Sequence, residues 1–338
     1  MALLVELSGE VPDLAGQEAM ATATVLSRGE VHVGDIDGRT IVVDAPDVTA
    51  SDLADRLGLA HHVSDQAVSG EIGKVVEIAS TMDIGPASSF RVRVHRSEPS
   101  VDLPSPRDLE ADIGSNIQAS TGAKVDLVSP EAEVRVVLAQ RAHVGLLGGS
   151  IDRKALEARA VKHRPFSHPV SIHPKYARAM VNLARVRPGD TVLDPFCGTG
   201  GILIEASLMG FRAMGSDIDG RMVEGSRTNM DAMGLMADLR TSDVSQAFSG
   251  LGVVPDAIVT DPPYGRSTSL HGGETSSVLG GLYSMSSAAL SPGGRLVLCL
   301  PSRDMLPVDE GNFSISSVHP MKVHRSLTRH VCVLIREK

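Results

Sequence analysis

The chain has 338 residues, of which 42% are hydrophobic, and a formal net charge of −9 at pH 7. This length suits two domains with a hydrophobic core each. Its three cysteines, Cys197, Cys299 and Cys332, lie far apart without a Cys-x-x-Cys pair, which argues against a disulfide framework and a zinc ribbon. No run approaches the roughly 18 apolar residues of a membrane span, and the first residues lack a basic leader. We expect a cytoplasmic protein with no metal and no membrane association.

The first 90 residues combine short apolar runs with one helix start. ALLVEL (2–7) and RTIVVDA (39–45) are typical of strands, and SDLADRLGLA (51–60) opens with a Ser-Asp pair typical of a helix N-terminus. No motif with recognisable chemistry occurs here. We predict an α+β element over residues 1–90.

The next segment predicts strand, helix and strand. SSFRVRVHR (88–96) and AEVRVVLAQ (132–140) alternate apolar and polar residues, and RDLEADIGSNIQAS (107–120) between them has helical spacing. We predict a second α+β domain over residues 91–150. Gly145, Gly148 and Gly149 then interrupt the pattern, and we predict a linker over residues 151–164 with a short charged helix.

The charge is unevenly distributed along the chain. Residues 1–90 contain 4 Lys/Arg and 15 Asp/Glu, a balance of −11, whereas residues 151–187 contain 9 Lys/Arg and 2 Asp/Glu, a balance of +7. The basic block has the charge to neutralise several phosphates of a nucleic acid, or it is a solvated helix and linker.

From residue 165 to residue 338, strands alternate with helices, which predicts an α/β domain with a mostly parallel, doubly wound sheet. The last two strands have little helical sequence between them, so we expect an antiparallel hairpin at one edge. Predicted strands are TVLD, FRAMGSD, ADLRTSD, DAIVTD, RLVLCL, SISSV and HVCVLI, and predicted helices include PKYARAMVNLARV, GILIEASLM, GRMVEGSRTNMDAM and SVLGGLYSMSSAAL.

The first of these strands leads into a glycine turn. TVLDPFCGTGG ends the strand at Asp194 and places Gly198 and Gly200 before a helix, so the backbone can approach a bulky ligand closely. Leu203 stands where a nicotinamide-binding loop needs a small residue, and no Gly-Lys-Ser/Thr follows for a phosphate. A carboxylate at Asp194 would repel a pyrophosphate and attract an ammonium group. These features favour S-adenosylmethionine as the cofactor.

Acidic residues end the next two strands as well. Asp217 lies 19 residues after Gly198, at the position where an acid accepts hydrogen bonds from ribose hydroxyls. Asp243 is placed to accept from an adenine amino group. Each acid is otherwise a cap or turn residue, an interpretation that is equally good for Asp243 and weaker for Asp194 and Asp217.

A second motif, DPPYG, follows the fourth strand. Pro262 and Pro263 stiffen the turn, and Asp261 and a backbone carbonyl beside it can both accept from one amino group. Such contacts would activate the exocyclic nitrogen of a base for methyl transfer, a reaction that depends on positioning and electrostatics. Tyr264 offers an aromatic face to an extruded base.

Together, DPFCGTGG, GSDID and DPPYG resemble the Rossmann-like amino-methyltransferases over residues 165–338. KHRPFSHPVSIHPKYARAMVNLAR and DPPYGRSTS resemble, more narrowly, the archaeal tRNA guanosine-10 N2-methyltransferases. That resemblance implies a ferredoxin-like element and a THUMP domain that grips the tRNA acceptor end. The resemblance also implies that Phe166, Ser167, His168, Asp194, Pro195, Gly198, Thr199, Gly200, Asp217 and Asp243 hold S-adenosyl-L-methionine, and that Asp261, Pro262, Pro263 and Tyr264 are catalytic.

We therefore expect methylation of the N2 amino group of a guanosine in tRNA, at position 10, without an obligatory protein partner. A ribosomal RNA guanine-N2 methyltransferase and a DNA amino-methyltransferase are the enzyme alternatives, although no helix-turn-helix is apparent. A non-catalytic RNA-binding subunit and a nicotinamide oxidoreductase fit the motifs less well. In the final HRSLTRHVCVLI, Arg325 and Arg329 are candidates for phosphate contacts or for solvated surface positions.

Overall fold

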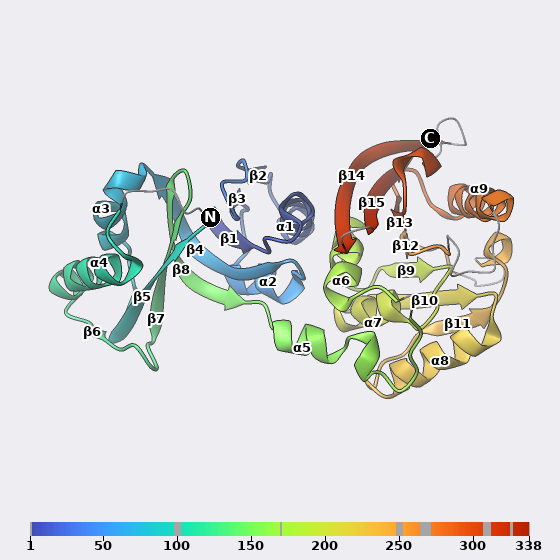
Figure 1. Ribbon diagram of the computed structural model, residues 1–338, viewed down its shortest axis with the longest axis horizontal. Helices are drawn as coiled ribbons and strands as arrows, with labels where there is room; N and C mark the ends of the chain where they lie inside the picture. The colour runs from blue at the N-terminus through green and yellow to red at the C-terminus, as the bar shows by residue number, and fades with distance from the viewer. Residues whose placement is uncertain are drawn as a thin grey trace. The chain divides into compact units, whose positions relative to one another are not determined.

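The computed structural model describes residues 2–97, 103–169, 171–247, 253–263, 272–306, 312–324 and 327–337 (Figure 1). Contacts between residues divide the chain into two compact units, Met1–Ile151 and Asp152–Lys338. Each has its own buried apolar core. Across the described ranges, no helix combines the length and the apolar character needed to span a membrane.

The N-terminal unit is built on one mixed sheet with the strand order β2-β3-β1-β4-β8-β7-β5-β6. The pairs β5–β7 and β5–β6 are parallel, and the other pairs are antiparallel. The strands are β1 (Ala2–Leu7), β2 (His32–Val33), β3 (Thr40–Asp44), β4 (Ala60–Gly70), β5 (Ser89–Arg96), β6 (Lys124–Val125), β7 (Ala132–Leu138) and β8 (Ala142–Ser150).

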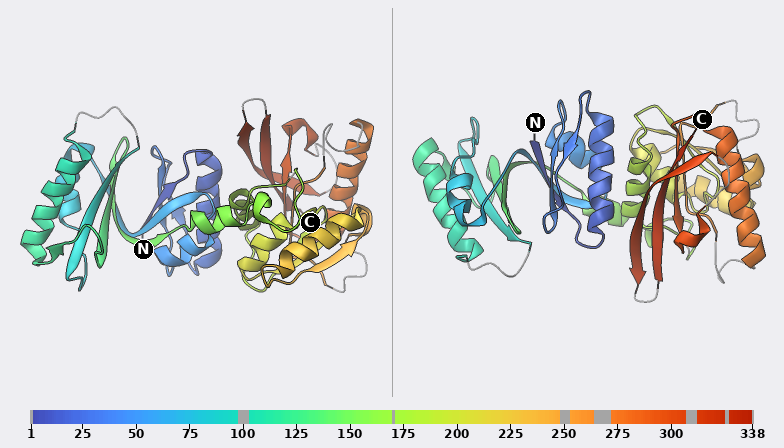
Figure 2. Two further views of the ribbon diagram at one scale, coloured as in Figure 1. Left: turned by 60° about the horizontal axis from the view of Figure 1, so that its bottom comes forward. Right: turned by 90° about the horizontal axis from the view of Figure 1, so that it is seen from above.

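Helices pack on this sheet at both of its ends (Figure 2). Thr49 and Asp52 form a capping box at the start of α2, and Gly122, with φ 74°, ends α4 in the left-handed conformation. Phe90 and Ile113 are fully buried between the sheet and α4. The helices are α1 (Pro12–Leu26), α2 (Ala50–Arg56), η1 (Ile72–Lys74), α3 (Val75–Ser80) and α4 (Pro106–Thr121).

Two sequence-based boundaries differ from this structure. The predicted division after residue 90 falls inside β5, and both sides of it belong to the same sheet. The glycines expected to interrupt the chain before the linker instead lie within β8; they are Gly145, Gly148 and Gly149. A Cβ at Gly149 would lie 2.6 Å from the Cβ of Ala54 on α2, so glycine lets the helix approach the strand closely.

The C-terminal unit has the strand order β11-β10-β9-β12-β13-β15-β14. The strands from β11 to β13 are parallel, and β15 pairs antiparallel with both β13 and β14, so the predicted doubly wound sheet and edge hairpin are confirmed. Strands are β9 (Thr191–Asp194), β10 (Arg212–Asp217), β11 (Asp238–Thr241), β12 (Ala257–Thr260), β13 (Arg295–Leu300), β14 (Phe313–His324) and β15 (Leu327–Arg336).

The predicted linker is not free chain, because it packs on the C-terminal unit. The buried Glu205 of α7 accepts from Arg159 at 2.8 and 3.0 Å and from Arg178 of α6 at 3.0 Å. Part of the basic block therefore has an internal partner and is not available to phosphates. The helices are α5 (Arg153–Ala158), η2 (Val161–His163), α6 (Pro174–Leu183), α7 (Gly201–Leu208), α8 (Gly220–Asp231), η3 (Val244–Gln246), α9 (Gly272–Ala289) and η4 (Arg303–Met305).

Candidate active site

The sheet order changes direction between β9 and β12. From β9 the chain proceeds to β10 and β11 on one side, and β12 and β13 lie on the other. The carboxyl ends of strands at such a switch point form the ligand crevice of doubly wound sheets. Asp194 ends β9 and Asp261 follows β12, and both line a cavity at this point together with Phe196, Gly198 and Thr199.

Asp194 is almost fully buried, at 2% exposure. Its Oδ1 accepts hydrogen bonds from the Thr260 hydroxyl at 2.7 Å and from the Phe196 N–H at 3.1 Å. Burial, and to a lesser degree the nearby charges of Asp261 and Asp217, raises the pKa of Asp194 to about 7, although the two hydrogen bonds act in the opposite direction. A cationic ligand would favour the ionised form of this carboxyl group.

The glycine loop has the backbone that the sequence predicted. Gly198 and Gly200 have φ of 49° and 79°, and the Gly200 N–H donates to the Cys197 carbonyl at 2.7 Å. A Cβ at Gly200 would overlap the hydroxyl of the buried Ser226 on α8. Glycine is thus required both by the turn and by the neighbouring helix.

Asp217 is tied directly to this loop. Its two oxygens accept from the N–H groups of Gly198 at 3.0 Å and Asp219 at 2.9 Å. Burial raises the pKa of Asp217 above its ordinary value. A carboxylate oxygen accepts more than one hydrogen bond, so these contacts leave acceptor capacity for ribose hydroxyls.

Asp243 has a different environment. It is exposed, and its Oδ1 accepts from the Ser245 N–H at 2.9 Å and the Ser245 hydroxyl at 2.6 Å, which caps η3. These bonds lower its pKa. Asp243 therefore has the cap role that the sequence left open, and its second oxygen accepts no bond from the described residues.

The segment around Phe166 is anchored by a residue that sequence analysis missed. The fully buried Asn229 of α8 accepts from the Phe166 N–H and donates to the carbonyls of Phe166 and Thr199, each at 2.9 Å. The Phe166 ring lies so close to Gly225 that a Cβ there would overlap it. A polar amide on the inner face of a helix was the available signal, because such a group needs buried partners.

The residues after Phe166 approach the glycine loop through Ser171. Its hydroxyl donates to the His168 carbonyl at 3.0 Å and lies 3.1 Å from the Thr199 hydroxyl. Ser167 is exposed and His168 half-buried. Arg164, buried in this region, also donates to the Thr199 hydroxyl at 3.3 Å. The predicted 166–168 segment is therefore close to the loop.

The motif at the end of β12 lies at the same crevice. Pro262 is buried, Pro263 is half-buried, and Tyr264 lies outside the described residues. Arg329 of β15 is not a surface cation facing phosphate, because it is buried at 9% exposure and its guanidinium contacts the Asp261 carboxylate. Arg325 also lies outside the described residues.

Comparisons with known proteins show which family the chain belongs to. Residues 162–331 match the RMKL-like methyltransferase domain family. The tRNA (guanine(10)-N2)-dimethyltransferase of Methanothermobacter thermautotrophicus is 37% identical over 99% of this chain and 100% of its own length. The chain belongs to the tRNA (guanine(10)-N2)-dimethyltransferase family. The protein of that name from Pyrococcus abyssi is 32% identical over 98% of both chains.

As a member of this family the chain is an S-adenosylmethionine-dependent methyltransferase, which confirms the predicted enzyme class and cofactor. The crystal structure of TrmN from Thermus thermophilus has a similar fold, with a TM-score of 0.56 and 23% identity over 99% of this chain and 100% of that one. The crevice suits the cofactor, because the carboxyl groups of the buried Asp194 and the half-buried Asp217 would attract the ammonium and sulfonium charges of such a ligand. No metal-binding group of three His, Cys, Asp or Glu side chains occurs in the described ranges.

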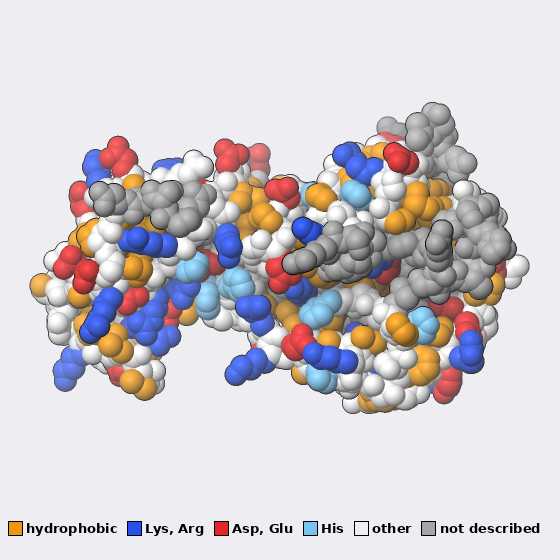
Figure 3. Space-filling view, in the orientation of Figure 1, with side chains coloured by type: hydrophobic (Ala, Val, Ile, Leu, Met, Phe, Trp, Pro, Cys, Tyr) orange, Lys and Arg blue, Asp and Glu red, His pale blue; other side chains and the backbone are white. Residues whose placement is uncertain are grey.

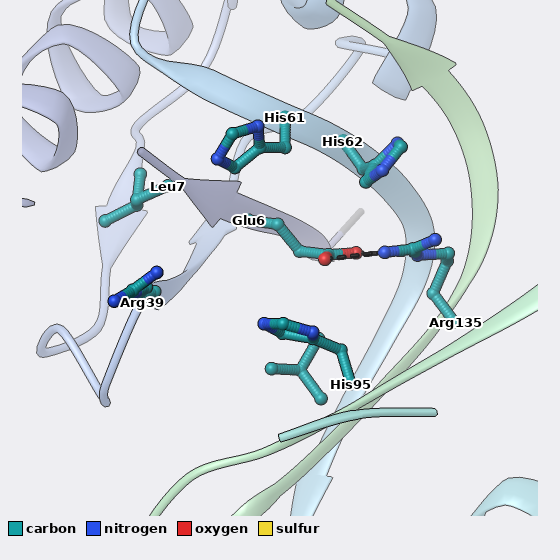
Figure 4. A pocket seen from close by; sticks show the side chains of 8 residues that line it. Glu6, Leu7, Arg39, His61, His62, His95 and Arg135 are labelled. Atoms are coloured by element: carbon teal, nitrogen blue, oxygen red, sulfur yellow. Dashed lines mark hydrogen bonds and ion pairs between the residues drawn. The ribbon is translucent and has the colours of Figure 1, made fainter. Parts of the chain in front are cut away.

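The N-terminal unit of the chain also contains a polar pocket (Figure 4). Arg135 of β7 donates to both oxygens of Glu6 at 2.7 Å, so this pair is neutral overall. The register of β1 and β4 shifts between Leu7↔Ala60 and Glu6↔His62, a bulge that lets two successive histidines line the pocket. Its lining consists of Glu6, Leu7, Arg39, His61, His62, His95, Arg135 and Val137.

Proposed function

We propose that the chain methylates the exocyclic N2 amino group of guanosine 10 in tRNA, giving N2-methylguanosine and then N2,N2-dimethylguanosine. The observation that supports it best is the position of Asp261 in the cavity that Asp194 and the glycine loop also line. The two full-length relatives named above are tRNA (guanine(10)-N2)-dimethyltransferases. A carboxylate acceptor beside a cofactor crevice suits an amino group as the target.

In the proposed reaction, Asp261 and a neighbouring backbone carbonyl accept hydrogen bonds from the two N–H groups of the target. These contacts orient the nitrogen and favour a pyramidal geometry, in which its electron pair is less delocalised into the ring. When bound, S-adenosylmethionine supplies an electrophilic methyl group on a sulfonium ion. Asp261 then accepts the proton that the methylated nitrogen loses. Pro262 and Pro263 fix the turn, and Tyr264 would stack on the base.

The cofactor residues of the proposal fall into groups by what they would contact. Asp194 would bind the methionine ammonium, Asp217 the ribose hydroxyls and Asp243 the adenine amino group. The glycine loop supplies backbone at close approach, and Asn229 holds the Phe166 segment beside that loop. The full proposed set is Phe166, Ser167, His168, Asp194, Pro195, Gly198, Thr199, Gly200, Asp217 and Asp243.

The decisive experiment is methylation of an unmodified tRNA transcript, followed by digestion and mass spectrometry mapped to position. N2-methylguanosine and its dimethyl form at position 10 are expected. A matched transcript with inosine at position 10 lacks the N2 amino group and should accept no methyl group there. Product on ribosomal RNA or DNA alone, with none on tRNA, would contradict the proposed substrate.

We also propose that the N-terminal unit contains a THUMP-like domain and binds the tRNA. Arg39 at the pocket of Figure 4 is exposed and forms no ion pair with any residue in the described ranges, so its charge is available to a phosphate. Figure 3 shows histidine and Lys/Arg side chains beside one another on one face of this unit, although residues 1–90 are acidic in sum.

The pocket makes a separate prediction for RNA affinity. Arg39→Gln should weaken tRNA binding and reduce the slope of log affinity against log salt by about one, because one phosphate contact is lost. Arg28, exposed and outside the pocket, is the matched control. Equal losses in Arg39→Gln and Arg28→Gln would show that the pocket has no special role.

We further propose that the chain acts in the cytoplasm without an obligatory protein partner. One chain combines a catalytic unit with a second unit suited to RNA, so no component of the proposed reaction has to come from elsewhere. Purified chain should methylate tRNA unaided. Activity that appears only after addition of a cell extract would contradict this part of the proposal.

A further inference from the structure

Arg329 reaches the active-site crevice because of the topology of the edge hairpin. Parallel strands bring their carboxyl ends to the crevice, but β15 is antiparallel to β13, with Leu300 opposite His330. The start of β15 therefore lies at the edge of the sheet where β13 ends. Arg329 is the third residue of β15, and its guanidinium contacts Oδ1 of Asp261.

This contact is formed in a poorly solvated environment. The side chains of Arg329 and Asp261 are 11% and 14% exposed. Asp194 and Asp217 add two more carboxyl groups near the same crevice. Arg329 forms an ion pair with one of these three acids, Asp261. An ion pair of this kind fixes the carboxylate in one orientation.

We propose that Arg329 is a positioning residue for methyl transfer, which holds the Asp261 carboxylate in the orientation that meets the target amino group. The inference rests on the proposed role of Asp261. Arg329 touches neither the target nor the methyl group in this scheme. It acts by fixing the acceptor that must meet the amino N–H, and a misplaced acceptor lowers the rate more than it lowers binding.

The test measures kcat, tRNA KM and cofactor Kd for Arg329→Gln in the full chain. We expect kcat to fall on the order of 100-fold, with little change in tRNA KM or in cofactor Kd measured by calorimetry. Arg329→Lys, which keeps the charge, should recover part of kcat. Arg336→Gln is the control on the same strand, because Arg336 donates to the carbonyl of Ser287 and not to the site.

A double-mutant cycle with Asp261→Asn separates this inference from the proposed function. If Arg329 acts through Asp261, adding Arg329→Gln to Asp261→Asn should lower kcat no further. A raised tRNA KM with unchanged kcat would overturn the inference in favour of a phosphate contact. A higher kcat would overturn it too, because Arg329 would then compete with the target for Asp261. Full activity of Asp261→Asn itself would refute the role of Asp261.

If Arg329→Gln fails to fold, as judged by circular dichroism and thermal unfolding, the lysine variant decides the question. Arg329→Lys retains a cation but loses the planar guanidinium that holds a carboxylate in one orientation. A reduced kcat with unchanged tRNA KM and cofactor Kd then supports the inference. Wild-type kcat in Arg329→Lys would overturn it, because orientation by the guanidinium would not matter.

Discussion

The ionised form of Asp194 lowers the stability of the folded protein. Its pKa rises from 3.8 to about 7 on folding, mainly through burial. Between these values the folded chain binds a proton that the unfolded chain lacks, so this group reduces stability progressively as the pH rises towards 7. The residue that we propose for binding the cofactor ammonium thus destabilises the cofactor-free protein at neutral and alkaline pH.

Asp194→Asn should therefore stabilise the cofactor-free protein at pH 8 and have less effect at pH 5. The amide oxygen can still accept from Thr260 and Phe196, but no charge is buried. Cofactor affinity should fall in the same variant. Urea unfolding at both pH values, with calorimetric titration of the cofactor, checks both effects. A stability change that is equal at pH 5 and pH 8 would contradict the assigned cause.

Asn229 is expected to matter for cofactor binding although it does not line the cavity. Asn229→Ala leaves the Phe166 N–H and the carbonyls of Phe166 and Thr199 without this partner, at a cost of about 3 kcal/mol. Cofactor Kd should rise as the Phe166 segment loosens. Asn116→Ala, on the exposed face of α4, is the control and should change neither quantity. Unaltered cofactor Kd in Asn229→Ala would show that the segment is held by other contacts.

At the level of elements, α5, α6 and α7 are joined by one buried charge. Glu205→Gln would remove the carboxylate that Arg159 and Arg178, which are 17% and 12% exposed, both contact. Breaking a buried ion pair from one side costs about 3–5 kcal/mol. Glu224→Gln is the control. Glu224 is exposed and forms a surface ion pair with Arg227 at 3.6 Å, and such a pair contributes little to stability. Thermal or urea unfolding measures the stability of both variants. An equal loss of stability in Glu205→Gln and Glu224→Gln would rule out a stabilising role for this network.

For the whole molecule, the two units predict separable binding functions. Each has its own sheet and core, and the glycine loop, Asp217 and Asp261 all belong to residues 152–338. A fragment with residues 152–338 should bind the cofactor with close to full affinity but lose most tRNA affinity. Calorimetry and a salt-dependent filter-binding assay measure the two. Full tRNA affinity in this fragment would place the RNA-binding surface on the catalytic unit.

The sequence predicted the C-terminal sheet well because strand and helix periodicity is a local property. Asp194 and Asp217 at strand ends and the glycines of the loop also followed from local order. β8 escaped prediction, because its three glycines resemble a loop in sequence. Only tertiary contacts explain them, since a Cβ at Gly145 would collide with Ser64 of β4 and a Cβ at Gly149 would collide with Ala54 of α2.

By itself, then, the sequence determined the methyltransferase fold, its cofactor crevice and the acids that end its strands. The tertiary structure alone decided which distant groups meet there. Asn229 bonds to Phe166 across 63 residues, and Arg329 contacts Asp261 across 68. Arg329 looked like a surface cation because its neighbours in sequence are polar. Arg329 is buried because β15 runs antiparallel to β13. The start of β15 therefore lies at the edge of the sheet where the parallel strands end and where Asp261 is located.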